Sequence, residues 1–261
     1  MRACNSQNYR AAWILTTAGA NLAAEDQSGN SALSWAAVSG NTQIVQLLLS
    51  NGAPANAPNM VRQTPLLEAA IAGDHAIVKL LLGYGANPHA RTGQVVEVKG
   101  KKIPRGSTAL MTATIMNEAK VIEVLCASKK GLEDIEFEER RTSLLLAAEH
   151  GTLATFHALV KGGASLRARS SGGLSALDLA VRGLNIEVLE SLISFQKRRL
   201  KARKEGIFSR EEFSAAISIM PNGGKALSAE MLIKLMELGV RVEQSDNCVP
   251  LTDPTEELWG W

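Results

Sequence analysis

The sequence predicts an all-α fold, an α-solenoid in which short helix-turn-helix units stack side by side and β-hairpin-like fingers connect them. Residues that start and end helices recur with a period of 33 over the first part of the chain, and periods of roughly 20–50 residues are typical of solenoids. Aromatic residues make up only 4% of the 261 residues, although 46% are hydrophobic. This composition favours small helices rich in Ala and Leu over a sandwich or a barrel.

The clearest repeat covers residues 62–87. Thr64 is suited to cap a helix at its N-terminus, and Pro65 suits the first helical position. Gly73 can adopt the left-handed conformation that ends this helix. A second helix with an apolar stripe follows and ends before Gly85. Such a helix pair is too small to bury its own apolar face, so it needs neighbours.

The same signals occur 33 residues earlier, where Ser31 stands for Thr64 and Gly40 for Gly73. At these residues the sequence resembles the ankyrin-repeat family, whose units have this period and a TPLHxA-like signature. The resemblance implies a non-catalytic scaffold that binds another protein and needs no cofactor. It does not imply which protein is bound. A monomer is the expected state.

Composition narrows the class of partner. A net charge of +2 is too small to argue for nucleic acid. Cys4, Cys126 and Cys248 are odd in number and form no CxxC pair, so we expect neither a disulfide framework nor a metal site. A reducing, cytoplasmic location follows. No apolar run approaches the roughly 20 residues of a membrane span, and no signal peptide is evident, so we expect no membrane contact.

We expect one array over residues 1–195, with six units at about 1–25, 26–58, 59–91, 103–131, 137–168 and 170–195. By the 33-residue count, Ala3 and Cys4 align with Ala36 and Ala37, inside a first helix. The chain is therefore expected to begin within a helix, as a fragment of a longer array or through a mis-set gene start. A natural, frayed half-repeat is the alternative.

An inserted finger is predicted at residues 92–106. Thr108 follows Thr64 by 44 residues instead of 33, so 11 residues have been added in the turn between two units. Val96 and Val98 alternate with polar residues, and Lys99-Gly100 can form a turn. This pattern predicts an elongated β-hairpin.

The later units keep the design with substitutions. Asn117 stands where Gly is expected, and Asn tolerates the left-handed conformation. The fifth unit opens at Thr142, and the sixth opens at Ser175. In the sixth unit Leu184 replaces the Gly that ends the helix, and we expect Gly183 beside it to serve instead.

Residues 196–240 are expected to form a basic helix extension and a degenerate terminal helix pair, and residues 241–261 an irregular tail. Ser209 and Glu212 form a predicted capping box. We expect Trp259 and Trp261 to pack back onto the last helices.

A calcium-responsive C-terminal module is an alternative for this end of the chain. Gly206, Phe208 and Glu212 match the second half of an EF-hand loop. However, Lys201 and Arg203 occupy positions where calcium needs oxygen ligands, which argues against a metal site.

The ankyrin resemblance nominates partner-binding residues on the finger tips and on the exposed face of each first helix. From the second and third units these are Gln27, Ser28, Asn30, Val38, Ser39, Met60, Val61, Gln63 and Ile71. From the later units they are Ile115, Met116, Glu149, His150 and Arg182. The alternative for each is contact with the neighbouring unit or with solvent.

The charges on the predicted fingers indicate a further contact. The inserted finger carries Arg91 at its start and a single acid, Glu97. Its other bases are Lys99, Lys101, Lys102 and Arg105, whereas the next turn holds Glu133, Asp134, Glu136, Glu138 and Glu139. These fingers either pair with each other, which contributes little at an exposed surface, or orient a charged partner. We expect the second role for the basic finger, because extra length beyond the scaffold seldom serves packing.

A basic run follows the sixth unit. It comprises Lys197, Arg198, Arg199, Lys201, Arg203 and Lys204. The run is either the solvated continuation of the last helix or a nuclear-localisation or anionic-surface signal. No aromatic residues are interleaved with these bases, so nucleic-acid stacking is not supported.

No enzymatic motif is present. The sequence has no GxSxG, P-loop or HExxH motif, and its four histidines are scattered across the units. A non-catalytic interaction scaffold is therefore predicted. The alternative is that the array is the regulatory or targeting region of a larger signalling protein or enzyme.

Overall fold

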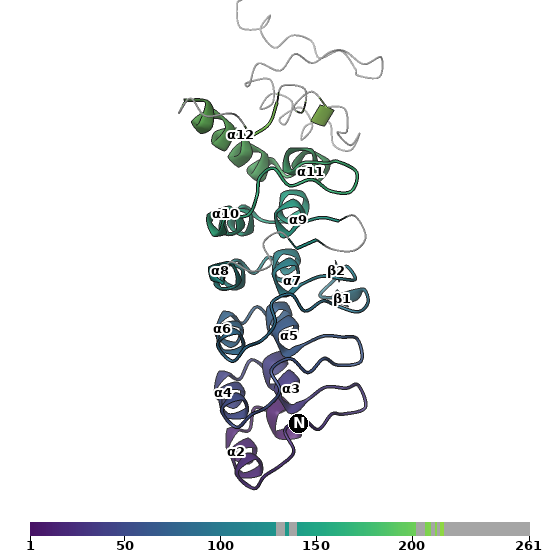
Figure 1. Cartoon of the computed structure of the whole chain (residues 1–261), viewed down its shortest axis with the longest axis vertical. Coiled ribbons are helices and arrows are strands. Elements are labelled where there is room, and N and C mark those ends of the chain that lie inside the picture. Colours follow the sequence, from purple (N-terminus) through teal and green to yellow (C-terminus); the bar gives the residue numbers. More distant parts are fainter. Residues whose placement is uncertain (129–133, 136–139, 202–206, 210–211, 213–214, 217–261) are drawn as a thin grey trace, which may run out of the picture.

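The computed structural model describes residues 1–128, 134–135, 140–201, 207–209, 212 and 215–216. Within them, helices pair along the chain and the pairs stack into two parallel columns (Figure 1). The first helices of the pairs are α1 (Arg2–Asn5), α3 (Ala32–Ser39), α5 (Pro65–Ala72), α7 (Ala109–Met116), α9 (Ser143–His150) and α11 (Ala176–Arg182). The second helices are α2 (Tyr9–Thr17), α4 (Thr42–Ser50), α6 (His75–Gly83), α8 (Ala119–Ala127), α10 (Leu153–Gly162) and α12 (Ile186–Lys201). The predicted all-α solenoid is confirmed.

Fingers extend from the column of first helices, away from the second helices (Figure 1). We call the surface formed by the fingers and the first helices the finger face. The apolar core runs between the columns from Cys4 to the segment around Phe208. One leucine near the start of each first helix from α3 onward is buried in it: Leu33, Leu66, Leu110, Leu144 and Leu177.

Side-chain caps start the first helices from α3 onward, as predicted. The Thr64 hydroxyl accepts a hydrogen bond from the backbone N–H of Leu67, and Pro65 occupies the first helical position. At the other end Gly73 is left-handed, with φ 81°. Asn117 also adopts this conformation, with φ 65°, so an amide side chain replaces glycine at the end of α7.

The end of α11 differs from the prediction. Gly183 has φ −80°, and Leu184 adopts the left-handed conformation instead, with φ 53°. Gly183 is needed for a different reason. A Cβ there would overlap the carbonyl oxygen of Glu149 in the preceding repeat, so glycine serves close packing between repeats.

The inserted segment is a two-stranded hairpin. Strand β1 (Val96–Val98) pairs antiparallel with β2 (Lys101–Ile103), with Val98 opposite Lys101. Lys99 and Gly100 form the turn, both at positive φ (51° and 73°). This conformation matches the right-handed twist of the strands, as in two-residue hairpin turns. The predicted hairpin is confirmed.

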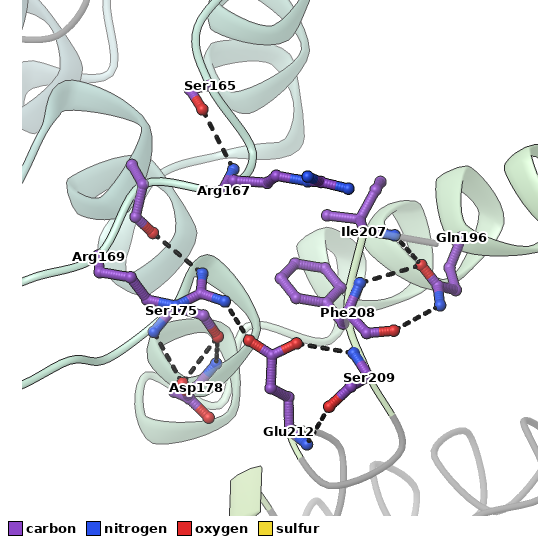
Figure 2. A network of polar contacts seen from close by, with 11 residues as sticks. Ser165, Arg167, Arg169, Ser175, Asp178, Gln196, Ile207, Phe208, Ser209 and Glu212 are labelled. Carbon is purple, nitrogen blue, oxygen red and sulfur yellow. Dashed lines mark hydrogen bonds and ion pairs between the residues drawn. The ribbon is translucent and has the colours of Figure 1, made fainter. Parts of the chain in front are cut away.

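A segment beyond α12 covers the end of the core (Figure 2). The buried Gln196 side chain accepts hydrogen bonds from the backbone N–H groups of Ile207 and Phe208, at 2.6 and 3.2 Å, and donates to the Phe208 carbonyl at 2.8 Å. The side chains of Ile207 and Phe208 are buried against the last repeat. Glu212 pairs with Arg169 and completes the predicted capping box with Ser209.

Other predictions for this end fall partly outside the description. The basic run begins on α12, where Lys197 and Arg198 are exposed, as its helical interpretation requires. Residues 202–206 and the rest of the predicted terminal helix pair, together with Trp259 and Trp261, lie outside the described residues. Among the described helices, none has the length and apolar composition that crossing a bilayer demands.

Candidate interaction surface on the fingers

Side chains that bind their own backbone shape the tips of the second and third fingers. The Asp26 carboxylate accepts hydrogen bonds from the backbone N–H groups of Asn30 and Ser28, at 2.9 Å each. The bond from Asn30 and a bond from the Trp35 indole hold the pKa of Asp26 below its ordinary value. Asn59 plays the same part in the next finger, where it accepts from two backbone N–H groups. Such turns are pre-shaped locally.

Backbone hydrogen bonds join neighbouring fingers into one edge. The N–H of Met60 donates to the carbonyl of Ser28 at 3.1 Å, and the N–H of Gly93 donates to the carbonyl of Val61 at 3.0 Å. A partner therefore meets a continuous edge rather than separate loops.

The finger face exposes apolar side chains. Met60 at the third finger tip is 74% exposed, Val38 on α3 is 47% exposed, and Val95 before β1 is 50% exposed. Sequence reasoning nominated Met60 and Val38 but did not nominate Val95.

The hairpin contributes bases beside these apolar residues. Its register places Glu97 opposite Lys102, and both are exposed. Lys99 and Arg105 are also exposed. The outer side of the hairpin therefore presents three cations against one carboxylate.

The inner side of the hairpin packs onto the finger face, which corrects part of the predicted site. Ile103 is fully buried and forms a small core with Ile71 and Met116. Ile115 packs against the same cluster. We expected Ile71, Ile115 and Met116 to be open to a partner, but the hairpin covers them, because its two strands need an apolar surface to pack on.

Lys101 anchors the hairpin instead of facing outward. Its ammonium donates to the carbonyl of Ile115 at the end of α7, at 2.6 Å. Of the four bases predicted near the finger tip, Lys101 therefore contributes least to an outward-facing charge.

Comparison with known proteins shows what this repeated geometry is. Residues 1–92 match the family model described as ankyrin repeats, in three copies. The chain contains ankyrin repeats. The helix pairs after residue 92 continue the same stacking, so the ankyrin-repeat fold extends beyond the matched segment.

Solved structures share the architecture. The ankyrin repeat domain of human ASB11 is 22% identical, with 89% of this chain and 96% of that chain covered and a TM-score of 0.68. A chain from the complex of the predatory endopeptidase Bd0816 of Bdellovibrio bacteriovorus with the immunity protein Bd3460 is 26% identical, with 73% of this chain and 94% of that chain covered and a TM-score of 0.59. Among curated proteins, none matches the sequence.

The other nominated residues of the second and third ankyrin repeats divide into exposed and bound. Gln27 and Ser28 are exposed at a finger tip. Asn30 accepts a hydrogen bond from the Asn59 side chain at 3.0 Å, and Gln63 is buried beneath that finger. The Ser39 hydroxyl donates to the carbonyl of Cys4 at 3.1 Å, so Asn30 and Ser39 connect neighbouring repeats, whereas Gln63 bonds to Asn59 within its own finger.

Glu149 and Arg182, both nominated for partner binding, form an ion pair with each other within the array. Glu149 is only 7% exposed, and its carboxylate lies 2.7 Å from Arg141 and 2.7 Å from Arg182 of the next repeat. A buried carboxylate needs such compensation. His150 beside it is exposed. The pair nominated for recognition therefore links the fifth and sixth repeats.

The oppositely charged fingers contact each other close to the helices from which they extend. The Asp134 carboxylate lies 2.9 Å from Nδ1 of His89 and 3.7 Å from the Arg91 guanidinium. Arg91 also donates to the carbonyl of Ile135 at 2.6 Å. The alternative that the two fingers pair with each other thus describes the contacts of Asp134 with His89 and Arg91. The remaining acids of that turn, Glu133, Glu136, Glu138 and Glu139, lie outside the described residues.

Sequence reasoning missed an unusual carboxyl group on the finger face. Glu68 on α5 occupies the position that Trp35 has in the previous repeat. Burial raises the pKa of Glu68 to about 7. The stacked position in the next repeat is Thr112, whose buried hydroxyl has no hydrogen-bond partner among the described residues. Aligning the repeats and looking for an acid in an apolar column could have found this residue.

The opposite face of the array has a shallow groove of about 990 Å³ across α2, α4 and α6. Tyr9 and Tyr84 line it, and the Tyr84 hydroxyl accepts a hydrogen bond from Gln46 at 2.7 Å. None of the partner-binding residues nominated from the sequence lines this groove. The groove therefore serves as a location for control substitutions rather than as the candidate site.

Proposed function

We propose that this chain is a non-catalytic scaffold that binds an acidic, partly apolar segment of another protein along the finger face of its second to fourth repeats. Ankyrin repeats generally mediate protein–protein interaction. The observation that carries the finer proposal is the combination of exposed Met60, Val38 and Val95 with the outward bases of the hairpin. Apolar anchors supply affinity, and charge complementarity supplies orientation and association rate.

The hairpin adds a wall to this surface. Because it packs on Ile71 and Met116, its outer bases have a fixed position relative to the finger tips. A fixed surface loses little conformational entropy on binding. We also place the scaffold in the cytoplasm, since Cys4 and Cys126 are buried and free, which suits a reducing compartment.

Charge reversal tests the proposal. In the triple variant Lys99→Glu, Lys102→Glu and Arg105→Glu, exposed groups change sign, so the fold should persist with unchanged circular dichroism. We expect partner capture from extracts of the source cells to fall at least about tenfold, because each reversed charge repels an acidic segment. Cross-linking with mass spectrometry then maps the contacted residues.

A matched control reverses three exposed bases away from the fingers: Arg10→Glu, Lys79→Glu and Lys120→Glu. Both variants change the net charge by the same amount. Capture lost only in the finger variant supports the proposal. Equal loss in both variants, or cross-links confined to the second helices, contradicts it.

A further inference from the structure

A small pocket lies between the third and fourth fingers, and none of the exposed apolar residues of the proposed interface lines it. Its volume is about 360 Å³, and its lining includes Arg62, Arg91, Asn56 and Asn87. No carboxylate of the described residues lines it. Two cations and two amides within one pocket form a donor-rich environment, which suits an anion.

Arg62 occupies a backbone position that three other fingers give to glycine. Its φ is 61°, and the equivalent residues Gly29, Gly106 and Gly173 have φ of 76°, 81° and 76°. An L-residue with a side chain is strained in this left-handed region, and such strain is concentrated at functional sites. Glycine would make the same turn without strain, so the turn does not account for the arginine.

The neighbouring finger makes room for the Arg62 side chain. A Cβ added at Gly93 would lie only 3.0 Å from both Cγ and Cδ of Arg62. The alkyl stem of Arg62 therefore lies across Gly93. Within the described part of the chain, no hydrogen bond or ion pair involves the Arg62 guanidinium, so its donors are available.

The other donors of the pocket are held in place. Arg91 donates to the carbonyls of Gly106 and Ile135, at 2.7 and 2.6 Å, and lies 3.7 Å from the Asp134 carboxylate, so its guanidinium is fixed and its charge is partly compensated. Asn56 donates to the Gly85 carbonyl and accepts from the N–H of Asn87.

The Asn87 side chain completes the donor set. Its Oδ1 accepts from the N–H of His89, and this bond orients the amide. Its Nδ2 has no partner among the residues that the structure describes. The pocket thus combines one available guanidinium, one available amide and one fixed guanidinium.

We propose that this pocket binds a phosphate monoester dianion, the group carried by a phosphorylated side chain of a protein partner. A phosphoryl group carries about −1.5 to −2 charges and three strong acceptor oxygens, which suits the available donors of Arg62 and Asn87 beside the partly compensated charge of Arg91. A carboxylate has two oxygens and one charge. The assignment of the phosphoryl group to a side chain of a protein partner rests on the proposed function, whereas the anion site itself is independent of it.

Inorganic phosphate and phenyl phosphate are the probes. Titration into the full chain, followed by NMR of the Arg62 Nε–H and Asn87 Nδ2–H signals, is expected to give saturable shifts with both. Acetate at equal concentration and ionic strength is expected to give none. Equal shifts with acetate would overturn the assignment to phosphate.

Arg62→Gly provides the sharpest variant, because glycine is the residue that three other fingers use at this turn. It removes the guanidinium and relieves the strain, so the fold should be kept. The expected loss of phosphate affinity is roughly tenfold or more, the effect of removing a charge-assisted hydrogen bond. Retained affinity in this variant would overturn the proposal.

Arg140→Gly is the matched control, since Arg140 has φ 54° at the equivalent turn of the fifth finger. It should leave the Asn87 shifts unchanged, and weakened binding in this variant would count against the proposed site. Failure of the two proposals is distinguishable. Phosphate binding that persists while the finger charge reversal leaves capture intact contradicts only the interface, whereas absent phosphate shifts with capture still lost contradict only the pocket.

Discussion

At the scale of single residues, burial of ionisable and polar groups decides where stability is lost. Glu68 is the clearest case, because its side chain is half-buried and, among the described residues, the single hydrogen bond of its carboxylate is a long contact of 3.5 Å with the Asn59 amide. The folded state favours the protonated form, with the pKa raised from 4.5 to about 7. A carboxyl group whose pKa is raised by burial lowers the stability of the folded state when it ionises.

Glu68 predicts a pH dependence with a definite sign. Between pH 4.5 and about 7 the folded state binds more protons at this site than the unfolded state, so the free energy of unfolding falls as pH rises through this window. Above about pH 7 the contribution of Glu68 to the free energy of unfolding no longer changes with pH. The fall should amount to roughly 1–3 kcal/mol, at about 1.4 kcal/mol for each pKa unit and with partial access to water. Urea unfolding at pH 5 and pH 8 measures it.

Glu68→Gln should remove this contribution to the slope and raise the stability at pH 8 above that of the wild type. Glu187→Gln, an exposed acid on α12, is the control and should leave the slope unchanged. A slope that survives in Glu68→Gln would assign the pH dependence to other groups.

Glycines supply a second prediction at this scale. Gly85 has φ 82° and open space where a Cβ would lie, whereas Gly183 has ordinary φ but no room for a Cβ. Gly85→Ala should therefore cost about 1 kcal/mol, the strain of the left-handed conformation. Gly183→Ala should cost more, because backbone of the neighbouring repeat has to move. Thermal unfolding of the two variants compares them, and equal losses would contradict the packing role of Gly183.

At the scale of elements, the hairpin shows how an insertion becomes part of the scaffold. A two-stranded ribbon is marginal alone in water. Here Ile103 anchors it to Ile71 and Met116, and Lys101 ties it to the end of α7. The alternation of residues along the strands then decides which side chains face outward.

Ile103→Ala should release the hairpin without unfolding the array. Removing a fully buried Ile side chain costs about 2–5 kcal/mol, and the small hairpin core cannot absorb this loss. Faster amide exchange in residues 94–105 with unchanged helical circular dichroism is expected. Val95→Ala, which alters an exposed side chain, should leave exchange unaffected. Global loss of helix in Ile103→Ala would show that the hairpin is essential to the array.

At the scale of the whole molecule, stability comes from stacking of each repeat on its neighbours. The two ends differ in the described structure. Trp13, Ile14 and Leu15 on α2 are exposed, whereas Ile207 and Phe208 cover the far end of the core. The second and third repeats have a neighbour on each side.

Amide exchange should follow this gradient. Mass spectrometry of the native chain is expected to show the fastest exchange in residues 1–18 and the slowest in α3 to α6, because end repeats open with the loss of one interface only. Uniform protection across the array would mean that it opens as one cooperative unit.

Local signals in the sequence were sufficient to predict the solenoid and the position of the hairpin. The caps at Ser31 and Thr64 and the Lys99-Gly100 turn each act within a few residues of the backbone that they shape, and the 33-residue period shows that these local signals recur. Asn117 at a helix end was predictable for the same reason. Met60 and Val38, both nominated from the sequence, are exposed, Met60 at a finger tip and Val38 on α3.

The contacts of the remaining nominated residues depend on tertiary packing. Ile71 and Met116 are covered by a hairpin inserted between their repeats, and Glu149 is paired with arginines from other segments. The pocket at Arg62 likewise combines two fingers. Contacts between repeats depend on how the units stack, and no single unit carries that information. The buried state of Glu68 arises in the same way, from the neighbours that surround it.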